Sequence, residues 1–337
     1  MQLPISLQQA LEQMSEQVPL AQIKAAYQQL SDSYRAGENS LTHFKEPATI
    51  LAYLLARMPA TYAAVYKALE SVKERLIDSS YKTLLDIGAG PGTASWAATE
   101  LFPELTSITL FEQSPEILSV GKKLASSSDL HSLQNSRWIG QNITEPFAPP
   151  KADMAIFSYV CSEVDCSKLI IDLWQAGTTL VIIEPGTPKG FATILKLRKE
   201  LLTLGAHIVA PCPHHFSCPM TTSWCHFPAR IERTKIHKLL KGGSLGYEDE
   251  KYSYLVVSPT PPSPIEARVV GIPLRPPKHI KLPLCTKEGT LELKTFTKKQ
   301  KNLYRQARNA DWGASIKTPE KSFESEGESN DQNDETI

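Results

Sequence analysis

A glycine-rich loop between a predicted strand and a predicted helix is the feature that most restricts how this chain folds. The segment runs from Leu84 to Thr93 and reads LLDIGAGPGT. Residues 83–87 form a short apolar run that predicts a buried strand, and residues 93–101 predict a helix. Glycine permits a sharp turn and the close approach of a ligand to the backbone. The following helix start offers unpaired N–H groups to such a ligand.

Strands and helices alternate beyond this loop. We predict further strands at 107–111, 137–139, 154–157 and 180–183, and helices at 115–124, 167–175 and 191–204. This alternation predicts an α/β fold with a parallel, doubly wound sheet. The residues before it, 1–76, have helical periodicity and predict an N-terminal helical region that serves as a lid or scaffold.

The spacing of the glycines distinguishes two cofactor classes. A dinucleotide fingerprint requires G-x-G-x-x-G, and Thr93 stands where its last glycine belongs. An acidic residue followed by glycines at alternate positions is the pattern of S-adenosylmethionine (SAM) sites, with a second acidic residue closing the next strand to accept ribose hydroxyls. The alternative is a tight turn that binds nothing. The expected cofactor-binding residues are Asp86, Gly88, Ala89, Gly90, Gly92, Glu112, Gln141, Asn142 and Ser158.

No catalytic residue is predicted. The carboxyl end of the strand at 154–157 is where catalytic groups are expected, but no base-methylation tetrapeptide such as Asn-Pro-Pro-Tyr follows it. The sequence therefore supports cofactor binding better than methyl transfer.

Three of the six cysteines, Cys212, Cys218 and Cys225, lie close together in a proline-rich segment, and Cys285 follows downstream. The N-terminus shows no export signal, so we expect a reducing, cytoplasmic location in which clustered thiols bind metal. Four thiolates suit a zinc ion or a 4Fe-4S cluster, and gaps of five and six residues favour the cluster slightly. Nearby histidines at 214, 215 and 226 keep a mixed zinc site open, and unligated buried cysteines are the remaining alternative.

The net charge of zero hides three unlike segments. Residues 1–228 carry 17 basic and 21 acidic side chains, residues 229–316 carry 17 and 8, and residues 317–337 carry 2 and 7. Basic side chains interleaved with aromatic ones predict an RNA-binding surface, against the alternative of an ordinary solvated face. The last segment has little to bury and predicts a disordered acidic tail. No apolar run is long enough to span a bilayer.

Several segments together resemble one family. They are Arg57–Tyr62, the glycine loop Leu85–Thr93, Pro211–His214, Trp224–Phe227 and Leu284–Thr286. The chain resembles the methyltransferase-like family associated with the mitochondrial ribosomal small subunit, which has bacterial relatives.

The resemblance implies a Rossmann-like SAM-dependent methyltransferase fold and a role in small-subunit assembly and translation on ribosomal RNA. It also implies a 4Fe-4S cluster, with zinc as the alternative. The SAM contacts implied by the resemblance are Asp86, Gly88, Gly90 and Glu112. The implied cluster ligands are Cys212, Cys218, Cys225 and Cys285.

The sequence supports two candidate functions. The first is a SAM-dependent methyltransferase that acts on the small subunit and its rRNA. The second is a non-catalytic iron–sulfur or zinc assembly factor with a degenerate SAM fold. We expect a monomer with no membrane contact. The predicted parts are a helical region (1–76), a Rossmann-like domain (77–210), a basic β-rich cysteine module (211–316) and the tail (317–337).

Overall fold

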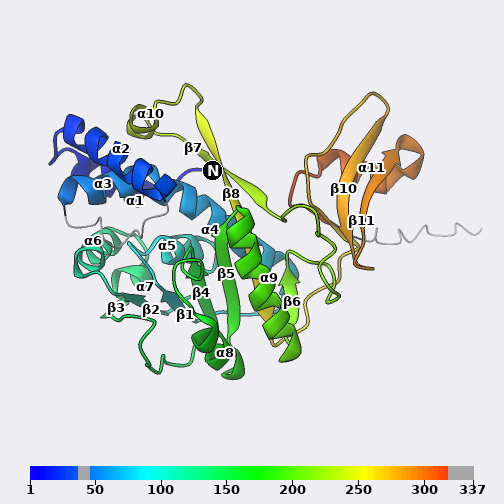
Figure 1. Cartoon of the computed structure of the whole chain (residues 1–337), viewed down its shortest axis with the longest axis horizontal. Coiled ribbons are helices and arrows are strands. Elements are labelled where there is room, and N and C mark those ends of the chain that lie inside the picture. The colour runs from blue at the N-terminus through cyan, green and yellow to red at the C-terminus, as the bar shows by residue number, and fades with distance from the viewer. Residues whose placement is uncertain (37–45, 318–337) are drawn as a thin grey trace, which may run out of the picture.

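The computed structural model describes residues 1–36 and 46–317 and is shown in Figure 1. The predicted tail, apart from Lys317, lies outside the described residues, as does the segment 37–45 of the predicted helical region. Four helices open the chain, as the periodicity predicts. They are α1 (Ile5–Ser15), α2 (Leu20–Ala36), α3 (Pro47–Ala56) and α4 (Met58–Arg75).

Helix α3 is the most apolar of these four, and most side chains of α3 and α4 are buried inside the protein. Each begins with a proline in its first turn, where the missing N–H costs no hydrogen bond. The two helices meet at Arg57 with a bend of 42°. Across the described ranges no single helix has the length and apolarity to cross a membrane; only the bent pair α3–α4 meets that test, by length and composition.

The main sheet has the strand order β3-β2-β1-β4-β5-β8-β6, with β7 paired to β8. Helices α5, α6, α7, α8 and α9 connect its strands. The strands are β1 (Thr83–Ile87), β2 (Ser107–Glu112), β3 (Arg137–Gly140), β4 (Met154–Ser158), β5 (Thr179–Pro185), β6 (His207–Ala210), β7 (Phe227–Glu232) and β8 (Tyr247–Ser258). The helices are α5 (Thr93–Leu101), α6 (Pro115–Ser126), α7 (His131–Gln134), α8 (Ser167–Gln175) and α9 (Pro188–Thr203).

The α/β class and the Rossmann-like fold are confirmed, but the expectation of a purely parallel sheet is wrong. Strands β1 to β5 pair in parallel, whereas β8 pairs antiparallel with β5, β6 and β7. The physical reason is the connection between β7 and β8. These two strands follow each other without a crossover, and such a connection produces antiparallel neighbours.

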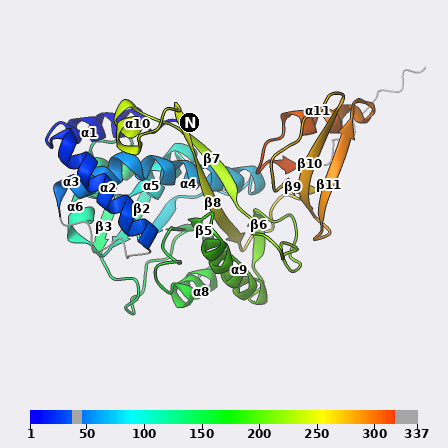
Figure 2. The ribbon, with the colours of Figure 1, turned by 45° about the horizontal axis from the view of Figure 1, so that its top comes forward.

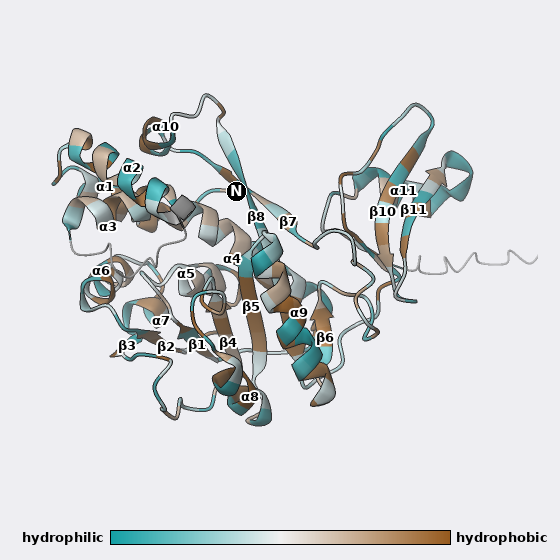
Figure 3. Cartoon of the chain, in the orientation of Figure 1, coloured by the Kyte–Doolittle hydropathy of each residue, from teal (hydrophilic) through white to brown (hydrophobic). Residues whose placement is uncertain are grey.

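Alternate residues of the central strands face opposite sides of the sheet. Leu84, Ile156 and Val181 belong to one core cluster, packed with α4 and α5. Their neighbours Leu85 and Phe157 belong to the other, packed with α8 and α9. Both faces are therefore covered, which explains why these strands are apolar without interruption. Figure 3 shows β4 and β5 as hydrophobic strands in the middle of this part of the molecule.

A second, smaller sheet lies beside the first in both views (Figures 1 and 2). Its strand order is β11-β10-β9-β12, and α11 packs on it around a third core cluster. Its elements are β9 (Ala267–Val269), β10 (His279–Thr286), β11 (Leu291–Thr297), η2 (Lys298–Gln300), α11 (Lys301–Asn309) and β12 (Ser315–Ile316).

Two expectations for residues 211–316 differ from the structure. Residues 252–257, which the sequence assigns to the β-rich module, are part of β8 in the main sheet, because their apolar side chains are buried on both faces and so suit a central strand. A helix, α10 (Lys235–Lys241), also lies where none was expected. Thr234 caps it by accepting the N–H of His237 through its side chain, and Gly242 ends it in the left-handed conformation.

Candidate functional site

The glycine loop opens onto a cavity of about 490 Å³ at the carboxyl ends of β1, β2 and β4. This is the edge at which Rossmann-like sheets bind their ligands, and the volume lies in the usual range for small-molecule sites. Helices α2, α3 and α4 line the opposite wall of the cavity. Six of the predicted cofactor residues line it: Gly88, Gly90, Glu112, Gln141, Asn142 and Ser158.

Two glycines are required by the local geometry. Gly88 has φ +65°, and a Cβ there would lie 2.6 Å from Val160 Cγ2. Gly92 precedes α5 with φ +85°, and a Cβ there would lie 3.0 Å from the Trp138 ring. Any side chain at these positions strains the backbone and collides with a neighbour, so the loop conformation depends on glycine.

Glu112 joins the glycine loop to the end of β2. Its Oε2 accepts the N–H of Gly90 at 2.9 Å, and its Oε1 accepts the N–H of Ser114 at 2.8 Å. Burial raises the pKa of Glu112, and the hydrogen bonds from Ser114 and Gly90 partly offset that rise. A carboxylate has about four acceptor positions, so Glu112 keeps capacity for hydroxyl donors from the cavity.

Asp86 is placed differently from the expectation of a ligand contact. It is 1% exposed and does not line the cavity. Its Oδ2 accepts the Ser95 N–H at 3.0 Å and the Ser95 hydroxyl at 2.8 Å, which fixes the start of α5 against β1. Burial raises its pKa to about 7. Ala89 and Gly92 also lie outside the cavity lining, so their predicted contacts would be indirect.

Tyr159, which follows β4 at the ligand-binding edge, forms a polar group with Glu250 and Arg57 that the sequence does not predict. The Tyr159 hydroxyl donates to Glu250 Oε1 at 3.1 Å, and Arg57 Nη2 donates to the same oxygen at 3.4 Å. Tyr159 has φ +61°, a rare conformation for a tyrosine, directly after β4. Its position after a central strand was a usable signal, whereas Arg57 and Glu250 reach this group from elements far away in sequence.

A second, tighter cavity contains all four predicted metal ligands: Cys212, Cys218, Cys225 and Cys285. The first three come from the segment between β6 and β7, and Cys285 comes from β10 in the smaller sheet. The cavity holds about 30 Å³ of open space. Within residues 1–36 and 46–317, no three His, Cys, Asp or Glu side chains are arranged to hold a metal ion.

Burial, and then the neighbouring thiols, raise the pKa values of three of the four cysteines: Cys218, Cys225 and Cys285. Burial raises the pKa of Cys225 well above its ordinary value, and the nearby Cys212, Cys218 and Cys285 raise it further. Burial also raises the pKa of Cys285 to about 12. Grouped thiolates are unfavourable here unless a cation neutralises them. By donor chemistry, four soft sulfur atoms around one cavity fit a metal–thiolate site, although the described side chains are not arranged as a preformed one.

The three nearby histidines are used differently. His214 Nε2 lies 3.4 Å from Cys285 Sγ. His215 Nε2 accepts the Ile208 N–H at 3.0 Å, and the His226 ring stacks on Trp224. Of these three histidines, His214 is the one that contacts one of the four cysteines among the described residues, so the mixed Cys/His alternative centres on it.

The family model for the mitochondrial small ribosomal subunit protein Rsm22 matches residues 47–317. This range includes the glycine loop, the polar wall and all four cysteines. The chain belongs to the Rsm22 family. The resemblance noted in the sequence is thereby confirmed.

Two curated relatives of this Rsm22-family chain illustrate its range. The human mitochondrial ribosome assembly protein METTL17 is 27% identical over 289 residues, which cover 78% of this chain and 61% of the relative. The mitochondrial Rsm22-cox11 tandem protein 2 of Schizosaccharomyces pombe is 26% identical, covering 78% of this chain and 42% of the relative. The chain thus spans less than two thirds of either relative's length.

Solved structures give weaker similarity. The plantazolicin methyltransferase BpumL, solved with S-adenosylhomocysteine, has a TM-score of 0.39 and 13% identity, covering 73% of this chain and 99% of its own. The magnesium protoporphyrin IX methyltransferase of Synechocystis PCC 6803 has a TM-score of 0.38 and 13% identity, covering 60% and 81%. The fold assignment of the Rsm22-family chain comes from its own strand order.

The basic side chains of this Rsm22-family chain form two groups with different surroundings. The first group contacts acidic side chains of β8: Arg230 pairs with Asp249 at 2.7 Å, and Arg233 pairs with Glu248 at 3.3 Å. The second group, from η2 and α11, is exposed, and in the described ranges none of its members is within 4 Å of a carboxylate. Its members are Lys298, Lys299, Lys301, Arg305 and Arg308. This exposed group belongs to the segment 229–316 for which RNA binding is predicted.

Proposed function

We propose that this Rsm22-family chain binds SAM in the larger cavity and acts in assembly of the small ribosomal subunit. The observation that carries the proposal is the position of Glu112: it closes β2, touches the glycine loop through Gly90 and faces the cavity. The family assignment and the printed name of the human relative support the ribosomal part.

Different residues of the chain would contact different parts of this cofactor. Glu112 accepts hydrogen bonds from the ribose hydroxyls, and Gln141 and Asn142 flank the adenine side. Gly88 and Gly90 let the cofactor approach the backbone. When bound, SAM supplies a methyl group on a sulfonium centre. The wall formed by Tyr159, Glu250 and Arg57 holds the acceptor by orientation and proximity.

A second candidate function is a non-catalytic assembly factor that keeps the SAM-type fold as a binding scaffold. The position of Asp86 favours it, because this acidic residue is bonded to Ser95 and is not directed at the cavity.

Calorimetric titration of the full chain with SAM, followed by a methyl-transfer assay on immature small subunits, separates the two candidates. Binding with transfer supports the enzyme. Binding without transfer supports the assembly factor, and no binding contradicts the SAM site and leaves an assembly factor with a degenerate SAM fold.

We also propose that the four cysteines hold a 4Fe-4S cluster, with zinc as the alternative. The grouping of four thiols from two sheets around one cavity supports a metal–thiolate site. Such a site would stabilise the fold, since metal binding energy contributes to folding energy. Measurement of iron, sulfide and zinc in anaerobically purified protein tests it; stoichiometric zinc without sulfide contradicts the cluster.

The ribosomal partner is proposed to be rRNA, bound through the exposed basic group of η2 and α11. Lys and Arg contacts to phosphates supply most sequence-independent affinity. Crosslinking of the tagged protein in cells tests the partner: small-subunit rRNA should dominate, and a dominance of transfer RNA contradicts it. The monomeric state and the cytoplasmic location stay predictions.

A further inference from the structure

Two arginine side chains are buried against the four-cysteine cavity. Arg198 from α9 is 5% exposed and Arg268 from β9 is 2% exposed, and both line the cavity beside the thiols. A guanidinium stays protonated in proteins. Each arginine therefore brings a full positive charge into the interior.

The charge of Arg198 has no acidic partner among residues 1–36 and 46–317. Its Nη2 donates to the carbonyl oxygens of His214 at 3.2 Å and Phe216 at 2.7 Å. Its Nε is buried and donates to nothing in the described chain. Because a buried charge without a counter-ion is strongly unfavourable, this position calls for an anion.

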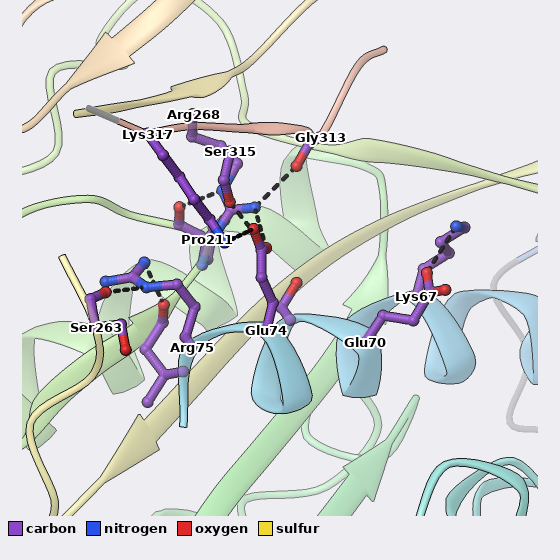
Figure 4. A network of polar contacts seen from close by, with 12 residues as sticks. Lys67, Glu70, Glu74, Arg75, Pro211, Ser263, Arg268, Gly313, Ser315 and Lys317 are labelled. Atoms are coloured by element: carbon purple, nitrogen blue, oxygen red, sulfur yellow. Dashed lines mark hydrogen bonds and ion pairs between the residues drawn. The ribbon is translucent and has the colours of Figure 1, made fainter. Parts of the chain in front are cut away.

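Arg268 is only partly compensated. Its Nε donates to the Pro211 carbonyl at 2.9 Å and its Nη1 to the Gly313 carbonyl at 2.9 Å (Figure 4). The nearest carboxylate is Glu74, at 3.9 Å from Nη1. That carboxylate also accepts the Ser315 hydroxyl at 2.9 Å and pairs with Lys317 at 3.4 Å.

The second terminal nitrogen of Arg268, Nη2, is buried and has no hydrogen-bond partner among the described residues. Each arginine thus has one buried N–H-bearing nitrogen that is unused and belongs to a side chain lining the cysteine cavity. Thioether and hydroxyl groups elsewhere in the lining cannot supply the negative charge that these nitrogens lack.

The missing charge matches the chemistry of a loaded cysteine site. Four thiolates around a doubly positive zinc ion, or around a doubly positive iron–sulfur core, leave two net negative charges. Two buried guanidinium groups supply two positive charges. With four neutral thiols, Arg198 would remain uncompensated and Arg268 would have only the carboxylate of Glu74, at 3.9 Å.

We propose that Arg198 and Arg268 are the counter-ions of the metal–thiolate site and donate their unused N–H groups to its sulfur atoms. They are positioning residues, since they act on the metal through the thiolates. The inference rests on the metal site proposed above. Hydrogen bonds to ligating sulfurs hold such ligands in place and tune the potential of a cluster.

The test uses the full chain, purified anaerobically, and follows loss of metal to an excess of chelator. Arg198→Met should lose metal at least tenfold faster than the wild type, because it removes both the charge and the donor. Arg198→Lys keeps the charge and should recover most of the retention. Arg275→Met is the matched control, since Arg275 pairs with Asp311 on the surface and does not line the cavity.

A second measurement, thermal melting, does not depend on whether the variant folds with metal bound. In metal-free protein, Arg198→Met should melt at a higher temperature than the wild type, because it removes an uncompensated buried charge. In loaded protein it should melt at a lower temperature. This reversal of sign is not expected of a side chain that only fills space.

The outcomes separate the two levels of the proposal. A wild type that holds no iron, sulfide or zinc overturns the metal site and this inference together. A wild type that holds metal while Arg198→Met retains it equally long overturns this inference alone. Lower melting of Arg198→Met in both metal states also overturns it.

Discussion

The two cavities of the molecule differ in how complete they are without a ligand. The larger one is built from the ends of neighbouring strands, and its key carboxylate, Glu112, already has two backbone N–H partners. The cysteine cavity is built from segments as distant as Cys212 and Cys285, and the two arginines that line it each bury a guanidinium nitrogen without a hydrogen-bond partner among the described residues. The first is preformed by the fold, whereas the second depends on what it binds.

The largest expected effect therefore belongs to the cysteine cavity. Cys218→Ser should remove a metal ligand and lower the free energy of unfolding by on the order of 4 kcal/mol or more, since loss of a metal is among the few mechanisms with effects of that size. Thermal melting with metal analysis measures it. Cys161→Ser, in the main sheet's core region, is the control, and equal losses in the two variants would contradict the ligand assignment.

The next effect concerns Glu184, which is fully buried at the end of β5 and accepts the Cys161 N–H at 2.8 Å. Burial raises its pKa from 4.5 to about 7. The folded state therefore binds the proton more tightly than the unfolded state, so stability is full below about pH 4.5 and falls as the pH rises to about 7. Glu184→Gln should remove on the order of 3 kcal/mol of this fall.

Chemical denaturation at a series of pH values measures that slope. Asp86 also titrates in this range, since burial raises its pKa to about 7, so part of the slope should persist in Glu184→Gln. Asp165→Asn is the control: Asp165 is exposed and its pKa is lowered by hydrogen bonds from Ser167. An unchanged slope in Glu184→Gln would show that this carboxyl does not titrate on unfolding.

A smaller effect is expected for ligand binding at the preformed cavity. Glu112→Gln should weaken SAM binding by about 1.5–3 kcal/mol, or roughly 10- to 100-fold, because charged hydrogen bonds to the ligand become neutral ones. Calorimetric titration measures the change. Glu116→Gln, on the exposed side of α6, should bind as the wild type does; equal weakening of both would place the ligand elsewhere.

The smallest effect distinguishes the two basic groups. Arg305→Ala on α11 should lower the salt dependence of RNA affinity by roughly 0.7–0.9 per lost phosphate contact, with a loss of a few-fold in affinity. Arg230→Ala should leave the salt dependence unchanged, because Asp249 already pairs with that charge. RNA titrations at several salt concentrations measure both, and the opposite ranking would move the RNA surface to β7 and β8.

Local sequence pattern predicted the strands and helices from 83 to 204, except the short helix α7, and the polar residues at their ends. The glycine loop, Glu112, Gln141 and Ser158 come together because parallel strands bring their carboxyl ends to one edge. The sequence did not reveal that β8 lies between β5 and β6, since this position is decided by tertiary pairing. The roles of Arg198 and Arg268 were equally invisible, because a charged residue in a helix or strand usually faces solvent.

Helix α4 connects the larger cavity to the segments around the smaller sheet, and this has a mechanical consequence. Thr61, near its start, lines the larger cavity, and Glu74 and Arg75, at its end, hold the segments around the smaller sheet (Figure 4). A helix of 18 residues is about 27 Å long, and α4 is buried along most of this length. Because α4 is one continuous helix, a tilt that widened the larger cavity would also displace the contacts that Glu74 and Arg75 make with the segments around the smaller sheet.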